Sequence, residues 1–426
     1  MKLRELQGII RAMRSIDSFF VFILFILIAV PTVVYFAEKD PFNIAGNFVP
    51  AENNSQTASL SDAVSVDDLK NRYKRFSNGR NHVANRIKVL IVPGHDDVHH
   101  GATFNGLREV DLNRELAKNL YQFLLKDKNF RVFLASDENG FNDRIENYLE
   151  EEKNEIEEFR KFKKQITESL IDSGEIQLEQ YVAHNSAPEE VANVLYGINR
   201  YANEEDFDIV LHVHFNDYPG RPKTSEGKHS GISIYVPASQ YSNGSASLEL
   251  AENIFGRLTK IFSPSTNPAE RVGVIQDTEL IAVGAFNSVD SIALLMEYGY
   301  IYEPQLTDEN LRPVVLKELA YQTYVGMKYF FDENYVASNS ETTLLPYTWY
   351  KDLDGKEKTD LDVFALQILL RLYEMYPPMN NFEDCPITGS FGKCTETALK
   401  NFQDKYGLET TGKLDSNTRD FLHDLI

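Results

Sequence analysis

Three histidines and a glutamate lie close together in one segment of the chain, VPGHDDVHHGATFNGLREVDLN from Val92 to Asn113. Imidazole nitrogens and carboxylate oxygens are the groups that bind Zn²⁺ in catalytic sites. His95 directly follows the apolar run IKVLIV, which predicts a buried strand, and Glu109 precedes an amphipathic stretch that predicts a helix. These two positions are therefore the first candidates for metal ligands.

Two further candidates end predicted strands later in the chain. His214 ends DIVLHVHF, and Glu297 ends IALLM. In an open parallel sheet, functional groups converge outside the carboxyl ends of the strands, so all four residues are expected at one edge. Two imidazoles and one carboxylate with an open fourth position form a common ligand set for a catalytic zinc.

We interpret His95, Glu109 and His214 as the metal ligands and Glu297 as the general base, because an apolar strand before Glu297 would partly desolvate its carboxylate. Each residue also has an ordinary structural interpretation. A histidine at a strand end is often a hydrogen-bonded surface residue, Glu109 could favour a helix N-terminus, and Glu297 could be a buried ion-pair partner. The joint arrangement favours the site.

The elements that must position these residues follow an alternating pattern from Ile87 onward. Apolar strands alternate with amphipathic helices over 86–335, which predicts an α/β catalytic domain with a mostly parallel sheet flanked by helices. The densely charged segment 143–179 predicts a helical insertion. Three interpretations remain open for it: a solvated helix on the domain edge, a lid, or a docking site for a regulatory protein.

Three short motifs carry a family resemblance. PGH with Glu109 fourteen positions after its His95, then LHVHFN, then LLMEYGYI together resemble the zinc-dependent N-acetylmuramoyl-L-alanine amidases of the Amidase 3 type. The resemblance implies zinc binding by His95, Glu109 and His214, catalysis by Glu297, and cleavage of the amide bond between N-acetylmuramic acid and L-Ala in peptidoglycan.

The chain departs from the family pattern at five positions. They are Val92, Asp96 and Asp97 in place of two glycines, His99, and His212 in place of a serine. None of these departures removes a ligand. We expect His99 and His100 at the rim of the site rather than on the metal.

The C-terminal segment 359–426, which follows a predicted linker over 336–358, is similar to the helical peptidoglycan-binding domain. The matching residues are Gln367, Gly389, Phe391, Gly392, Thr395, Ala398, Phe402, Gln403, Gly407, Leu408, Gly412 and Thr418. The two cysteines, Cys385 and Cys394, lie within this segment, and the sequence leaves open whether they form a disulfide or stay as thiols.

The N-terminal part predicts an exported protein. Residues 1–18 form a basic cytoplasmic segment, the uncharged run 19–37 predicts a transmembrane helix, and 38–85 predicts an extracytoplasmic stalk. If 19–37 were instead a cleaved signal peptide, the protein would be secreted. The net charge of −21 argues against a nucleic-acid partner.

Two rival functions remain at this point. One is another zinc amidohydrolase or peptidase that cuts within the stem peptide. The other is a non-catalytic peptidoglycan-binding protein that keeps the fold. Retention of all four candidate residues argues against the second of these functions.

Overall fold

The computed structural model describes residues 64–77, 86–179, 187–337, 341–356, 358–378 and 384–425. The chain divides into two compact units, Met1–Ser61 and Asp62–Ile426, and every described residue belongs to the second. The basic segment 1–18, the predicted transmembrane helix 19–37 and the stalk up to residue 63 lie outside the described residues. Among the helices that are described, none combines the length and the apolar character needed to cross a bilayer.

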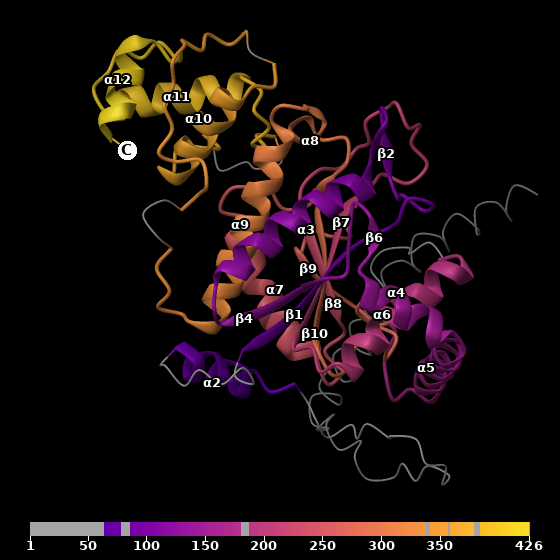
Figure 1. The fold of residues 1–426 in the computed structure, drawn as a ribbon. Coiled ribbons are helices and arrows are strands. Elements are labelled where there is room, and N and C mark those ends of the chain that lie inside the picture. The colour runs from indigo at the N-terminus through magenta and orange to yellow at the C-terminus, as the bar shows by residue number, and fades with distance from the viewer. Residues whose placement is uncertain are drawn as a thin grey trace, which may run out of the picture. The chain divides into compact units, whose positions relative to one another are not determined.

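A six-stranded sheet forms the centre of the catalytic domain, in the order β4-β1-β7-β10-β8-β9 (Figure 1). The strands are β1 (Ile87–Pro93), β4 (Phe130–Leu134), β7 (Ile209–Asn216), β8 (Ser233–Pro237), β9 (Val274–Asp277) and β10 (Ile292–Tyr300). The first four in the spatial order are parallel, whereas β8 pairs with β10 in the antiparallel sense. The prediction of a mostly parallel sheet is confirmed.

Helices cover both faces of this sheet (Figure 1). One face carries α3 (Glu109–Lys126), α7 (Gly244–Leu258) and α9 (Arg312–Phe331), and the other carries α6 (Glu189–Glu204). Alternate residues of β1 point into two separate cores, Val89 toward the first face and Leu90 toward the second. Burial on both faces explains why the strands appear in the sequence as continuous apolar runs.

Shorter elements connect this framework. Two small antiparallel pairs are formed by β2 with β3 and by β5 with β6, and a single helical turn, α8, precedes α9. Their bounds are β2 (Thr103–Phe104), β3 (Leu107–Arg108), β5 (Ser136–Asp137), β6 (Gly140–Phe141) and α8 (Pro304–Thr307).

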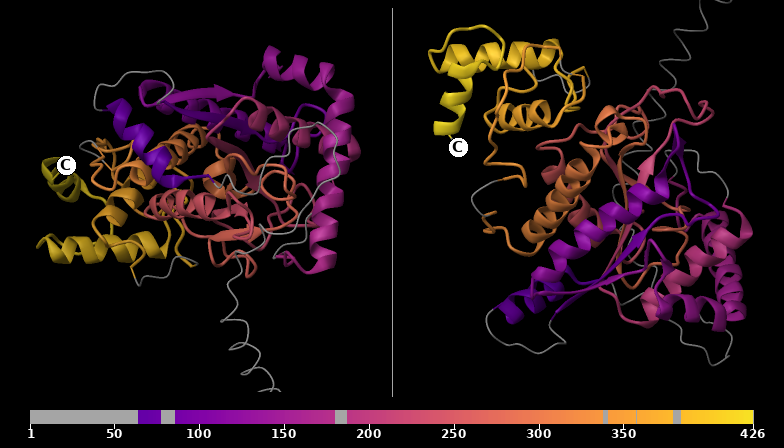
Figure 2. Two further views of the ribbon diagram at one scale, coloured as in Figure 1. Left: turned by 90° about the horizontal axis from the view of Figure 1, so that it is seen from below. Right: turned by 45° about the horizontal axis from the view of Figure 1, so that its top comes forward.

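The charged segment 143–179 forms two helices, α4 (Asp143–Glu151) and α5 (Lys153–Ser173), as its periodicity predicts. Figure 2 shows α5 along the edge of the catalytic domain. Beyond α5, Ile176 packs against Ala238 and Tyr241, which follow β8. Because β8 runs antiparallel to β10, these contacts lie at the edge opposite the carboxyl ends of β1, β7 and β10. Of the three interpretations of the insertion, these contacts favour a helix that covers the domain edge.

Residues 66–77 of the predicted stalk form a helix that packs on the catalytic domain. In α2 (Val66–Ser77), Leu69 and Tyr73 are buried, and the Tyr73 ring stacks on Phe331 at 4.7 Å between centroids. The Lys328 ammonium donates to the Tyr73 hydroxyl and forms an ion pair with Asp127. The stalk prediction is therefore wrong for these residues, because α2 has an apolar face that the domain buries.

Three helices form the C-terminal segment, α10 (Leu361–Leu372), α11 (Lys393–Lys405) and α12 (Ser416–Leu425). Six apolar residues of these helices are fully buried and form their core: Leu366, Leu369, Leu370, Ala398, Phe402 and Leu422. Cys385 and Cys394 form a disulfide, which settles the alternative left open by the sequence. Before α10, the predicted linker contributes Trp349, whose buried indole donates to the Asp362 carbonyl.

We expect Tyr73→Ala to destabilise the catalytic domain by about 3 kcal/mol, because it removes a buried aromatic ring and leaves the Lys328 ammonium without its hydroxyl partner. Chemical denaturation of the purified protein measures the change. Tyr350→Ala is the control, because Tyr350 is 86% exposed and should be neutral. Equal effects of the two substitutions would contradict the docking of α2.

Candidate metal centre

His95, Glu109 and His214 lie together at the carboxyl edge of the sheet. The Glu109 Oε1 atom lies 3.1 Å from His95 Nε2 and 3.0 Å from His214 Nδ1. One ligand atom from each residue falls within 4.8 Å of the other two. In the part of the chain that the structure describes, no other group of three such side chains meets this condition. The structure thus brings together the three residues predicted as metal ligands.

Each of the three comes from a different element. His95 follows β1 with a positive φ of 70°, a backbone conformation that non-glycine residues rarely adopt. Glu109 is the first residue of α3, and His214 lies near the end of β7. Strain at a single residue is often found at functional sites, and here it turns the His95 ring toward Glu109.

His95, Glu109 and His214 are called the triad below. Two glycines leave the space that these three side chains occupy. A Cβ atom on Gly94 would lie 2.1 Å from the His214 ring, and one on Gly101 would lie 2.3 Å from Glu109 Oε2. Gly101 also has a φ of +71°. Neither position therefore accepts a side chain without moving a member of the triad.

Backbone and amide groups fix the orientation of the ligands. Glu109 Oε2 accepts a hydrogen bond from the Ala102 amide at 2.8 Å. The buried Asn113 side chain donates to the Gly94 carbonyl at 2.9 Å, which ties the first turn of α3 to the loop that carries His95. Such supporting contacts are typical of metal sites, where they hold the ligands ready for the ion.

Charge favours a cation among these groups. Burial opposes ionisation of Glu109, but hydrogen bonds from His214 and His95 hold its pKa well below the usual range. Burial lowers the pKa of His214, so its imidazole is neutral at pH 7. A buried carboxylate and a neutral imidazole are suitable donors for Zn²⁺, and the side chain of His95 keeps 28% of its surface exposed. The donor set therefore fits the predicted metal.

Glu297 lies next to the triad. In the parallel pair of β7 and β10, Glu297 is the register partner of His214. Its Oε2 atom is buried and accepts no hydrogen bond from any residue that the structure describes. Burial raises the pKa of this carboxyl well above its ordinary value, and the charges of Glu109 and Glu270 raise it further. This is the environment expected of a general base.

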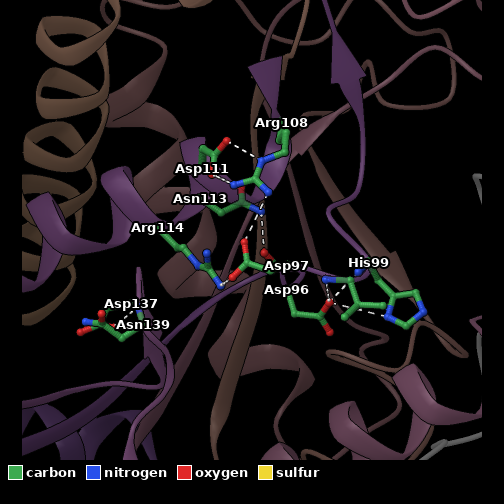
Figure 3. Close-up of polar contacts among 11 residues, drawn as sticks. Asp96, Asp97, His99, Arg108, Asp111, Asn113, Arg114, Asp137 and Asn139 are labelled. Atoms are coloured by element: carbon green, nitrogen blue, oxygen red, sulfur yellow. Dashed lines mark hydrogen bonds and ion pairs between the residues drawn. The ribbon is translucent and has the colours of Figure 1, made fainter. Parts of the chain in front are cut away.

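The two aspartates that replace family glycines stabilise the loop after His95. Asp96 accepts hydrogen bonds from the backbone of Val98 and His99. Figure 3 shows the Asp97 carboxylate between Arg108 and Arg114, and the Arg114 nitrogen lies 3.0 Å from it. Asp96 thus stabilises the loop itself, and Asp97 connects it to α3. The conspicuous His99 and His100 lie outside the cluster of three, as expected for rim residues.

His212, which lies two residues before His214, is fully buried. Neither of its ring nitrogens has a hydrogen-bond partner within the described residues. Burial lowers the pKa of His212 to about 3, with a smaller effect of His214. The folded protein therefore holds this imidazole neutral.

No pattern in the sequence singles out Glu270, a buried carboxylate near Glu297. It lies in the loop before β9, in a stretch with no periodicity or recognisable motif. Only the fold brings it to the same edge as the triad.

Gly94→Ala should weaken metal binding roughly 10- to 100-fold, because the added methyl group displaces the His214 ring. Titration of the metal-free protein with Zn²⁺ measures the affinity. Gly256→Ala in α7 is the matched control, since a Cβ there meets no atom within 4 Å. Unchanged affinity in Gly94→Ala would argue against the triad as the metal centre.

His212→Leu should make the stability of the protein less sensitive to acid. The unfolded chain protonates His212 near its ordinary pKa of about 6.5, whereas the folded chain does so only at about 3. The wild-type protein therefore loses stability through this residue as the pH falls from about 6.5 to about 3. Denaturation midpoints of both proteins across this window test the effect, and parallel curves would refute it.

Comparisons with known proteins agree with this geometry. Residues 89–329, more than half of the chain, match the family described as N-acetylmuramoyl-L-alanine amidase. Residues 359–422 match the family described as a peptidoglycan binding domain. Among curated proteins, no sequence matches the chain.

Solved structures similar to the chain include several amidases. An N-acetylmuramoyl-L-alanine amidase from Clostridium difficile 630 is 16% identical, with 59% of this chain and 99% of that chain covered and a TM-score of 0.36. The CwlD amidase from Clostridioides difficile, in complex with the GerS lipoprotein, is 16% identical over 58% and 100% of the two chains, with a TM-score of 0.38.

A third similar structure is the amidase Ami1 from Mycobacterium smegmatis, 13% identical over 58% of this chain and 97% of that chain, with a TM-score of 0.37. Since all three TM-scores lie below 0.5, the assignment rests on the family match over 89–329. By that match, the chain belongs to the N-acetylmuramoyl-L-alanine amidase family.

Proposed function

We propose that this protein is a zinc-dependent amidase that cleaves the bond between N-acetylmuramic acid and L-Ala in the peptidoglycan stem. The observation that carries the proposal is the meeting of the His95, Glu109 and His214 side chains beside Glu297, whose buried Oε2 atom accepts no hydrogen bond from the described residues. A cation site next to a buried base is the arrangement that amide hydrolysis requires.

The four residues would have two roles: three would bind the metal, and Glu297 would transfer protons. His95, Glu109 and His214 would hold the zinc ion, which when bound polarises a carbonyl oxygen and lowers the pKa of water. Glu297 would take a proton from the attacking water and deliver it to the departing alanine nitrogen. Its raised pKa suits both steps, since the same group must first accept the proton and then release it.

The C-terminal domain would increase the time that the enzyme spends on its insoluble substrate. Residues 359–422 match a peptidoglycan binding domain, and a second binding module on the same chain raises the effective concentration of the active site near the polymer. The domain thus supports a polymeric substrate rather than a free small molecule.

We further propose that the protein acts outside the cytoplasm, tethered to the membrane by the apolar run 19–37 or secreted if that run is cleaved. Peptidoglycan as substrate agrees with an extracytoplasmic site. A regulatory protein that docks on the insertion 143–179 stays a prediction. The densely charged surface of α5 is the feature that motivates it.

Mass spectrometry of digested peptidoglycan tests the proposal. The amidase should release stem peptides that begin with a free L-Ala amine, and Glu297→Gln should lower the rate by roughly 10²- to 10⁴-fold while zinc stays bound. Removal of the metal by a chelator should abolish the activity, and added Zn²⁺ should restore it.

The same digest distinguishes the rival functions. New amino termini inside the stem peptide would identify a peptidase. Stoichiometric zinc without any product would identify a non-catalytic binding protein. Full activity of Glu297→Gln would remove Glu297 from its proposed role as base.

A further inference from the structure

Glu270 has an unusual set of neighbours for a buried carboxylate. Only 1% of the residue is exposed. It accepts four hydrogen bonds, from Asn216 Nδ2 at 2.9 Å, the Tyr235 hydroxyl at 3.0 Å, Ser265 Oγ at 2.5 Å and the Tyr300 hydroxyl at 3.1 Å. All four donors are neutral, so the carboxylate is held by dipoles rather than by a cation.

Three of these donors lie on β10, which carries the proposed base, or on the strands paired with it. Asn216 and Tyr300 are register partners at the ends of β7 and β10, and Tyr300 lies three residues after Glu297. On the other side of β10, Ser233 of β8 pairs with Glu297, and Tyr235 lies two residues further along β8. Tyr235 and Glu297 are therefore diagonal neighbours on adjacent strands, and an aromatic side chain can reach across this spacing. Glu270 therefore joins the groups that border Glu297.

The Tyr235 hydroxyl is the critical group among them. Burial raises the pKa of Tyr235 well above its usual range, and the charges of Glu270 and Glu297 raise it further, so the hydroxyl stays protonated. A phenolic hydroxyl has one proton to donate. Because Tyr235 donates this proton to Glu270, it does not donate it to Glu297.

The Oε2 atom of Glu297 is in fact buried and accepts no hydrogen bond from the described residues. We propose that Glu270 is a positioning residue, which keeps the Tyr235 hydroxyl turned away and so leaves Glu297 Oε2 open to the reacting water. This inference rests on the proposed function, in which Glu297 is the base.

When a neutral side chain replaces Glu270, the Glu297 carboxylate becomes a stronger acceptor for the Tyr235 hydroxyl than the side chain at position 270. The base would then have to break a hydrogen bond to a charged group before it could receive a proton from water. Such a bond corresponds to a factor of roughly ten or more in rate. Substrate binding and zinc binding do not involve this step, so neither should change.

The experiment compares four proteins on soluble peptidoglycan fragments: wild type, Glu270→Gln, Tyr235→Phe/Glu270→Gln, and Glu303→Gln. Glu303 is the matched control, another buried carboxylate with neutral donors, which lies outside the proposed machinery. We expect Glu270→Gln to lower kcat roughly tenfold with KM and zinc content unchanged. The double variant should regain most of this loss, since no hydroxyl remains to block Glu297.

A purely structural role for Glu270 predicts the opposite order, because the double variant loses one more hydrogen bond and should be slower than the single one. That order, or a wild-type kcat in Glu270→Gln, would overturn the inference while the proposed function stands. If Glu270→Gln does not fold, Glu270→Ala with and without Tyr235→Phe gives the same comparison, because this substitution also removes the charge. An inactive wild type, or an active Glu297→Gln, would overturn the proposed function and this inference with it.

Discussion

The buried carboxylate of Glu109 is the group on which the arrangement of the candidate site depends. Its Oε1 atom lies within 3.1 Å of both imidazoles, and its Oε2 atom accepts the Ala102 amide. Burying a charged carboxylate costs free energy unless donors or positive groups surround it. The two ring nitrogens supply part of that compensation, and a divalent cation would supply the rest. The close approach of three elements therefore has an electrostatic cause as well as a steric one.

The sheet explains why residues far apart in sequence meet here. Parallel strands place their carboxyl ends at one edge, so His95 and His214 converge although 118 positions separate them. Glu297 joins them because β10 pairs with β7 in a register that sets it beside His214. Both faces of these strands are buried, which holds their carboxyl ends in place and keeps the three candidate ligands within reach of one another.

The sequence was sufficient to predict the α/β class, the meeting of three candidate ligands at one edge of the sheet and the helical C-terminal segment, because each depends on local apolar patterns and on where strands and helices begin or end. It was insufficient for α2, whose apolar face is short and follows a polar stretch, so that only packing against Phe331 reveals its place. Glu270 was missed for a different reason. Its importance comes from four partners on separate elements, and no local signal in the chain marks such a residue.

The docking of α2 uses one end of the parallel strands. Arg72 pairs with Asp208, just before β7, so α2 lies at the amino ends of the parallel strands. The triad lies at their carboxyl ends. The docked helix and the candidate site therefore lie at opposite ends of the same strands. A substitution that loosens α2 would act on the sheet from the end away from the triad.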